Sequence, residues 1–202
     1  MVAKIFDEIL LKGIRSGQVP ARTQSAREWY REQAKNVRRS DINETTIMKE
    51  SRDRYESKFL IGNMYMFVYN PKHKDTLPYY DRFPLVFPIN RAKGGFLGIN
   101  MHYLPHQLRA TLMDALYDVV SNNRFDETTK IKASYSILNG AAKYKEFQPT
   151  IKHYLSNHIV TNFVYINPAE WDIALWLPVE KFVGASRAKV WEDSKKIIRG
   201  NR

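Results

Sequence analysis

The sequence predicts an α+β fold in which a small curved antiparallel sheet, or SH3-like half-barrel, packs with several helices and carries an N-terminal helical arm. Apolar residues recur at spacings of three and four near the start of the chain and again after residue 105, as in amphipathic helices. The middle instead contains short runs rich in aromatic and β-branched residues, which is typical of strands. Proline and glycine lie at the bends of these runs, which indicates strong curvature.

The first 58 residues are predicted to form the arm. One amphipathic helix covers residues 2–14, and a second runs from Ser25, its capping residue, to about residue 38. Residues 40–58 are polar and show no apolar stripe, so they form either an extended connector or an exposed helix. We therefore divide the chain into an N-terminal helical arm and connector, residues 1–58, and an α+β core domain with a basic C-terminal helix, residues 59–202. This division predicts that the core folds without the arm.

Three strands are expected in the middle of the chain, over residues 64–69, 83–89 and 96–103. Two prolines in the second run favour an edge or bent strand. Gly98 inside the third indicates a bulge or a tight bend. The remaining elements are helices that begin at Pro105, Asp126 and Pro149, strands over residues 159–166 and 173–179, and a last helix over about residues 186–198.

Composition excludes several classes of protein. The chain has 202 residues and no cysteine, which excludes disulfides, zinc sites with cysteine ligands and thiol catalysis. No run of about 18 apolar residues is present, which excludes a membrane-spanning helix. Acidic residues interrupt the first apolar stretch, so we expect no signal peptide. These features indicate a soluble protein of a reducing compartment, with enough residues for one core.

A formal net charge of +11 favours a polyanionic partner. Basic residues concentrate within residues 22–39 and 187–202, and phosphate binding, a solvated helical face and docking onto an acidic protein all fit this charge. Arg27, Arg31 and Lys35 are four residues apart and therefore share one face of the second helix. The candidate DNA- or partner-binding cations are Arg27, Arg31, Lys35, Arg38, Arg39, Arg82, Lys195, Lys196 and Arg199.

Two tyrosines complete the candidate binding residues. Aromatic side chains interleaved with cations on a curved sheet are suited to stacking on exposed bases. Phe83, Phe87 and Phe96 are expected to fill the core, so Tyr79 and Tyr80 in the preceding loop are the better candidates for contact. Exposed tyrosine and arginine equally suit a protein–protein interface.

The sequence offers little support for catalysis or metal binding. His102 and His106 have a spacing that suits metal ligation, but Pro105 lies between them and no glutamate follows His102. Asp75 and Asp81 are candidates for magnesium, yet aspartate is also a common turn residue. No phosphate-binding loop or nucleophile elbow is present. We therefore predict no catalytic residue, no metal, no cofactor and no small-molecule substrate.

Five segments together resemble a known family. They are residues 25–31 (SAREWYR), 62–72 (GNMYMFVYNPK), 77–88 (LPYYDRFPLVFP), 94–105 (GGFLGINMHYLP) and 176–182 (WLPVEKF). They resemble a tailed-bacteriophage virion protein, the DNA end protector or head completion family of contractile-tailed phages. The resemblance supplies no residue-level binding motif, so the candidate residues above rest on charge and exposure.

The resemblance implies a non-enzymatic virion protein. It would bind the end of packaged double-stranded DNA at the head–tail junction and shield it from host exonuclease. Its partners would be the DNA end, other virion proteins such as portal, neck or baseplate subunits, or both, and it would occupy the host cytoplasm only during assembly. The alternative is a structural neck or baseplate component that docks onto neighbouring subunits through the arm without reading DNA.

Overall fold

A six-stranded antiparallel sheet lies at the centre of the computed structural model, which describes residues 5–19, 23–120, 122 and 124–200. Arg22 and Arg202 of the two basic regions, and residues 2–4 of the first expected helix, lie outside the described residues. The strand order is β1–β7–β2–β4–β5–β6, and β3 pairs with β8 in a second small sheet. The strands are β1 Tyr55–Glu56, β2 Met64–Met66, β3 Tyr80–Asp81, β4 Leu85–Ala92, β5 Gly95–Asn100, β6 Ile151–Leu155, β7 Phe163–Ile166 and β8 Phe182–Val183.

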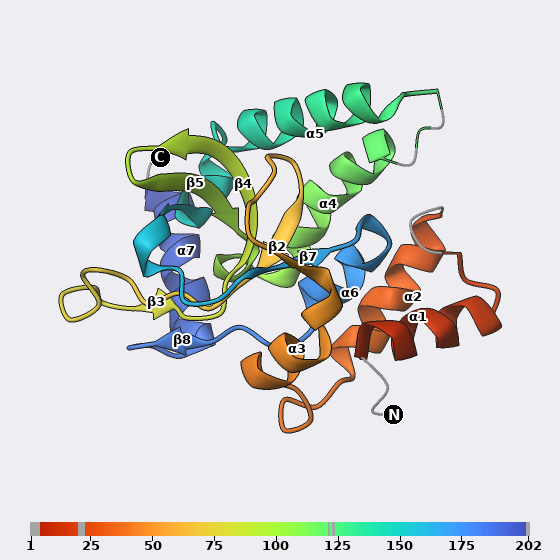
Figure 1. The fold of residues 1–202 in the computed structure, drawn as a ribbon, viewed down its shortest axis with the longest axis horizontal. Helices are drawn as coiled ribbons and strands as arrows, with labels where there is room; N and C mark the ends of the chain where they lie inside the picture. Colours follow the sequence, from red (N-terminus) through yellow and green to blue (C-terminus); the bar gives the residue numbers. More distant parts are fainter. Residues whose placement is uncertain (1–4, 20–22, 121, 123, 201–202) are drawn as a thin grey trace.

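Seven α-helices surround the sheet within the described residues. They are α1 Ile5–Arg15, α2 Gln24–Lys35, α3 Glu44–Glu50, α4 His106–Val120, α5 Glu127–Ala141, α6 Trp171–Trp176 and α7 Arg187–Gly200. α4, α5 and α6 lie along one side of the sheet, α1 and α2 pack together at one end of the molecule, and α7 lies towards the other end (Figure 1). The expected α+β fold with a curved antiparallel sheet and an N-terminal helix is confirmed.

Helix starts follow local capping chemistry. The Asp126 carboxylate accepts a hydrogen bond from Thr129 N at 2.7 Å, as the sequence predicts for the start of α5. The N-cap of α2 lies two residues earlier than expected, because Thr23 rather than Ser25 caps the helix and accepts a hydrogen bond from Ala26 N at 3.1 Å.

Both faces of the sheet are buried, and β2 shows how. Alternate side chains of a strand point to opposite faces. Met64 and Met66 join the large core beneath the helices. Tyr65, together with Phe67 and Tyr69 just beyond the strand, joins a second, aromatic cluster on the opposite face. Hence the run over residues 64–69 is apolar throughout.

Strong curvature brings distant segments together at one corner of the sheet. The register shifts between Pro88 and Asn90, beside the pairing of Pro88 with Gly98, which agrees with the irregularity predicted at Gly98. The end of β2 folds over towards the chain that leaves β6, where Tyr69 pairs with Ile159 in an isolated bridge. The Tyr69 hydroxyl also accepts a hydrogen bond from Leu155 N at 3.2 Å.

Three sequence predictions need correction. The helix predicted from Pro149 is instead strand β6, which pairs with β5 after a short 3₁₀ turn. The strand predicted over residues 173–179 is largely helix α6, in which every residue is buried, so no periodic pattern marks it as a helix. Residues 40–58 are not an exposed connector, because α3 buries Ile47 completely and β1 pairs with β7.

The N-terminal helices pack into the same core as the sheet. Phe6, Ile9, Tyr30 and Ile47 are all buried in the cluster that contains the β2 methionines. Gly13 permits close contact between α1 and α2, since a Cβ there would lie 2.1 Å from the Tyr30 hydroxyl oxygen. The division of the chain after residue 58 stays a prediction, and this packing argues against independent folding of its two parts.

Candidate nucleic-acid interface

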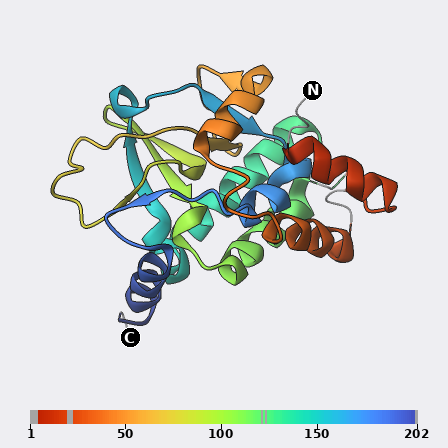
Figure 2. The same cartoon turned by 90° about the horizontal axis from the view of Figure 1, so that it is seen from below.

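The two basic regions of the chain lie towards opposite ends of the molecule. α2 packs beside α1 at one end, whereas α7 and the loop of residues 71–79 lie towards the other (Figures 1 and 2). α7 borders that loop, because the carboxylate of Asp193 interacts with the Tyr79 hydroxyl. The cations of each end must therefore be judged by their own surroundings.

Two cations of α2 are occupied by carboxylates of other helices. Arg31 Nε lies 2.6 Å from Asp172 Oδ1, and Arg31 Nη2 lies 2.6 Å from Asp114 Oδ1. Arg27 Nε lies 3.8 Å from the same Asp114 oxygen, and the Arg27 guanidinium lies over the ring of Tyr117. Only 9% of the Arg31 side chain is exposed. The prediction that Arg31 contacts a partner is therefore corrected: Arg31 ties α2 to α4 and α6.

The cations that follow along the chain are exposed. Lys35 and Arg38 each pair with an acidic residue three positions away, at 3.4 and 3.1 Å. Arg39 donates a hydrogen bond to the Glu180 carbonyl, and Arg82 lies 3.4 Å from an acidic residue of α3. Ion pairs at exposed sites are worth little, so Lys35, Arg38 and Arg82 stay available to a partner, whereas Arg39 is held by a backbone carbonyl. Their role in binding stays a prediction.

α7 presents its cations to solvent. Lys195, Lys196 and Arg199 are exposed, whereas Val190 and Ser194 of the same helix are buried. Lys196 pairs with a glutamate one turn earlier at 2.7 Å. The prediction of a basic, solvent-facing C-terminal helix agrees with this arrangement, and what the cations contact stays a prediction.

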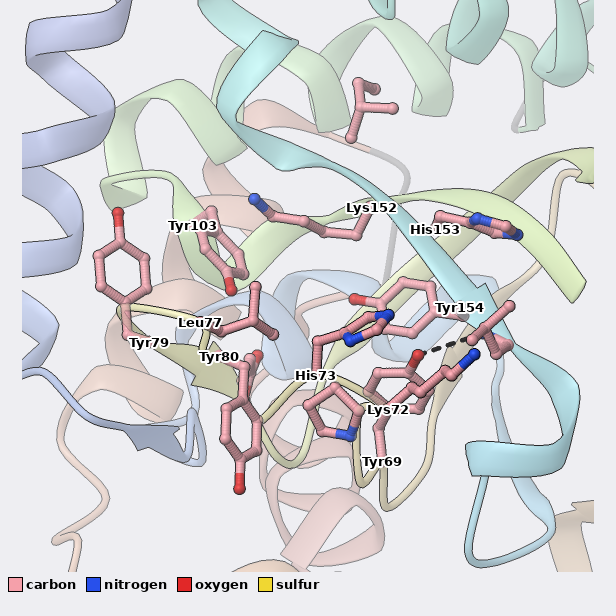
Figure 3. A pocket seen from close by; sticks show the side chains of 14 residues that line it. Tyr69, Lys72, His73, Leu77, Tyr79, Tyr80, Tyr103, Lys152, His153 and Tyr154 are labelled. Carbon is pink, nitrogen blue, oxygen red and sulfur yellow. Dashed lines mark hydrogen bonds between the residues drawn. The ribbon is translucent and has the colours of Figure 1, made fainter. Parts of the chain in front are cut away.

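A pocket of about 440 Å³ lies between the loop of residues 71–79, β6 and the end of β2 (Figure 3). Its wall combines aromatic rings with basic side chains. The tyrosines are Tyr69, Tyr79, Tyr80, Tyr103 and Tyr154, and the basic residues are Lys72, His73, Lys152 and His153. One acidic residue, Asp81, also lines it. Pockets of about this size hold small ligands.

Tyr79 and Tyr80, the two tyrosines predicted to make contact, both line this pocket. Their rings point in opposite directions, as expected of neighbours in an extended segment (Figure 3). The ring centre of Tyr79 lies 6.2 Å from that of Tyr103, at an angle of 36° between the ring planes. Burial, and then the charge of Asp193, raises the pKa of Tyr79. Tyr79 therefore forms an aromatic wall with Tyr103, and Tyr80 does not.

Lys152 is the chemically distinctive residue of the pocket. Its ammonium nitrogen lies 4.0 Å from the centre of the Tyr103 ring. Burial lowers the pKa of Lys152 to about 8, and no carboxylate in the described part of the chain forms an ion pair with it. A buried cation without an acidic partner costs stability, and a bound anion would remove that cost.

Replacing Lys152 by methionine is expected to stabilise the protein by about 1–3 kcal/mol at pH 7, because the variant no longer buries an unpaired charge. The pKa of about 8 lies below the ordinary value of 10.5, so between these values the unfolded chain binds the proton that the folded chain has released. The unfolding free energy of the wild type should therefore rise from pH 8 to about 9.5, below the range where unfolded tyrosines ionise, and that of Lys152→Met should rise less.

Urea unfolding at pH 7, 8 and 9.5 measures this difference. Tyr79 and Tyr103, which line the pocket with Lys152, have raised pKa values, so their ionisation lies above this window. Lys132→Met, at an exposed site on α5, is the matched control and should change little. If Lys152→Met and Lys132→Met changed the unfolding free energy equally, the description of Lys152 as an unpaired buried charge would be contradicted.

Asp81 at the base of the pocket is fully engaged in hydrogen bonds. Its Oδ1 accepts from Phe83 N and Lys181 N, at 3.1 and 3.2 Å. Its Oδ2 lies 2.7 Å from His102 Nδ1 and accepts from Asn100 Nδ2 at 3.1 Å. These contacts hold β3, β5 and the chain before β8 together, so Asp81 acts as a structural residue of the pocket.

The residues considered for metal binding do not converge. His102 contacts Asp81, whereas His106 stacks on Trp176 with ring centres 5.3 Å apart. Burial, and then Arg109, lowers the pKa of His106 to about 4. Among the described residues, no group of three or more His, Cys, Asp or Glu side chains is placed to hold a metal ion.

Residues 3–199 match the model of the phage T4 terminal DNA protecting protein family. The match spans nearly the whole chain. The chain belongs to this family. Neither a curated protein nor a solved structure matches it. The resemblance to a DNA end protector family of phages is confirmed, and the association with DNA ends and with a phage follows from the family.

No helix in the described ranges is long and apolar enough to cross a membrane.

Most of the residues that line the pocket of this family member could not be predicted from the sequence. Tyr69 and Tyr103 fall in predicted strands and look like ordinary sheet residues, while Lys152 and Tyr154 fall in a segment predicted to be helical. The run IKHYL, residues 151–155, shows no alternation of apolar and polar residues, so it offers no clear strand signal.

Proposed function

We propose that this member of the DNA protecting family binds the end of packaged double-stranded DNA at the head–tail junction of a phage particle, and shields it without catalysing a reaction. The observation that carries the proposal is the pocket of tyrosines and basic side chains beside the exposed cations of α7. Stacking surfaces and cations are what an exposed terminal base and its flanking phosphates require.

The two parts of this end of the molecule have different tasks in the proposal. Tyr79 and Tyr80 offer stacking surfaces that a continuous duplex cannot use, since its bases are already stacked on both sides. Lys195, Lys196 and Arg199 of α7 contact phosphates of any duplex and so add affinity without end preference. End recognition therefore depends on the pocket, and general affinity on α7.

The proposal of a non-enzymatic role is supported by the state of the acidic groups in the pocket. Asp81 would be the natural candidate for a general base or a metal ligand there, but both of its oxygens already accept hydrogen bonds. Asp75 is exposed in the loop and is not part of the pocket lining. The pocket is therefore better suited to binding than to hydrolysis.

A second candidate function is docking onto neighbouring subunits of the neck or baseplate through the arm. Leu11 and Ile14 of α1 are 52% and 59% exposed, on the helix that lies farthest from the pocket end. Exposed apolar side chains on one helix favour a protein partner. This contact is compatible with DNA-end binding, because it uses the other end of the molecule.

The test of the proposal is a gel shift that compares a blunt linear duplex with a covalently closed circle of the same sequence. We expect tighter binding to the linear duplex, and a log-log salt slope of about −0.9 for each phosphate contacted. Replacing Lys195, Lys196 and Arg199 by glutamine should make that slope shallower for both DNAs. The matched control, Lys12→Gln with Arg15→Gln at exposed positions of α1, the helix farthest from the pocket, should leave it unchanged. Equal affinity for the linear duplex and the closed circle would refute end recognition. Binding to neither DNA would favour docking onto neighbouring subunits as the only function.

A further inference from the structure

A DNA end differs chemically from the interior of a duplex in two respects. The terminal base pair has one uncovered face, and the last phosphate, where present, is a monoester. A phosphate monoester carries close to two negative charges at pH 7, whereas a phosphodiester carries one. A protein that distinguishes ends from interior by contact has to read at least one of these features.

The pocket is large enough for one nucleotide and too small for a base pair with both backbones. Its volume of about 440 Å³ lies in the lower part of the range of sites that enclose small ligands. Aromatic rings line two sides of it, from Tyr79 and Tyr103 on one side to Tyr69 and Tyr154 on the other (Figure 3). A single unpaired or frayed nucleotide therefore fits its shape and its walls.

Lys152 supplies the pocket with an unneutralised positive charge. Its ammonium group extends towards Tyr103 (Figure 3), 4.0 Å from the ring centre, and forms no ion pair with the described residues. The acidic side chain of the pocket offers it no partner, because Asp81 is held by four donors from its own surroundings. The lowered pKa of Lys152 is what a cation held ready for an anionic ligand would show.

Exposed basic side chains stand at the rim of the same pocket. Lys72 and His73 come from the loop before β3, and His153 comes from β6. They are placed to meet phosphates that follow the first nucleotide, while Lys152 is less exposed than they are. The rim thus provides contacts that any DNA strand can make. The interior provides a contact, that with Lys152, which only the end of a DNA strand can reach.

We propose that this pocket holds the terminal nucleotide of a DNA strand, with its phosphomonoester on Lys152 and its base against Tyr79, the partly exposed ring of this wall. The inference rests on the proposed DNA-end function and specifies what is read at the end. Strand ends with a 5′-phosphate and with a 3′-phosphate share this chemistry, and the experiment distinguishes them.

The test compares linear duplexes that differ only at their termini: 5′-phosphate, 3′-phosphate, or hydroxyl groups at both ends, with a closed circle as reference. Affinity is measured by fluorescence anisotropy at fixed salt. The wild type should bind one phosphorylated end at least about tenfold more tightly than the hydroxyl end, as expected of a charge-assisted contact. Lys152→Gln should bind all three linear duplexes alike, and Lys72→Gln at the rim should weaken all three while keeping the preference.

The outcomes separate this inference from the proposed function. A wild type that prefers linear DNA but treats phosphate and hydroxyl ends alike refutes the pocket assignment and leaves the end function intact. If the wild type binds linear duplexes and the closed circle equally well, the proposed recognition of DNA ends is itself refuted. Competition by a free deoxynucleoside 5′-monophosphate, and not by the deoxynucleoside, gives a second readout on the unaltered protein. Failure of both compounds to compete, together with an unchanged preference in Lys152→Gln, would overturn the proposal.

Discussion

Deletion of residues 1–58 is expected to abolish the cooperative thermal unfolding of the chain. The deleted segment buries Phe6, Ile9, Tyr30, Ile42 and Ile47 in the main core. Each large apolar side chain contributes about 1.5–3 kcal/mol when buried, so five contribute roughly 7–15 kcal/mol. A typical domain has a total stability of about 5–15 kcal/mol. The remaining residues would also expose the apolar surface that these side chains cover.

Differential scanning calorimetry of residues 59–202 measures the effect. Leu11→Ser, at an exposed site of the same segment, is the control, and we expect it to keep a sharp transition. A cooperative transition in the 59–202 fragment would show that the N-terminal segment is a separable arm, as the sequence division predicts. In that case the second candidate function, docking through the arm, would gain support.

Arg31→Ala is expected to lower the unfolding free energy by about 3–5 kcal/mol at pH 7.5, as for other buried ion pairs that lose one partner. The substitution removes both 2.6 Å contacts of the guanidinium and leaves the Asp172 carboxylate buried, with 3% of its side chain exposed. Burial disfavours the charged form of Arg31 and by itself would lower its pKa. The carboxylates of Asp172 and Asp114 have a larger combined effect, so the pKa of Arg31 is raised. The pair therefore stays charged and links α2 to α4 and α6.

The loss of unfolding free energy caused by Arg31→Ala should become smaller as the pH is lowered. Burial raises the pKa of Asp172 to about 6 against the attraction of Arg31, and without Arg31 that pKa rises further. At pH 5 the variant protonates Asp172 and no longer buries an unpaired charge, so the difference from the wild type is smaller than at pH 7.5. Chemical denaturation at both pH values measures this.

Lys35→Ala, one turn later on an exposed site, is the control and should change stability by less than about 0.5 kcal/mol. An Arg31→Ala effect no larger than this would contradict the structural role assigned to Arg31. Charge reversal of Arg27, Arg31 and Lys35 together would therefore destabilise the protein, so a loss of binding in that variant would not identify the interface.

Local patterns were enough to locate the central strands. The continuous apolar run at β2, whose two faces are both buried, and the proline and glycine residues around β4 and β5 are properties of neighbouring residues, so they are visible in the sequence. α6 was missed because burial on all sides removes the helical pattern. β6 was missed because its pairing with β5 joins segments more than 50 residues apart, and Pro149 resembled a helix start.

The candidate site shows the same limit. Tyr79 and Tyr80 were found because they lie in an aromatic loop between two strands. Lys152 and Tyr103 were not, because only the tertiary fold brings them beside that loop. Arg31 looked like a surface cation on a polar helix, and its carboxylate partners lie 83 and 141 residues further along the chain. Charge placement in sequence therefore overestimated the interface on α2 and missed the pocket.

The most direct test is exonuclease digestion of a blunt linear duplex in the presence of the intact protein. Occlusion of the terminus predicts that stoichiometric protein blocks digestion from the bound end, that excess closed circles do not relieve the block, and that the DNA length stays unchanged without exonuclease. Unimpeded digestion, or shortening of the DNA by the protein itself that is lost on changing one acidic side chain, would contradict the account.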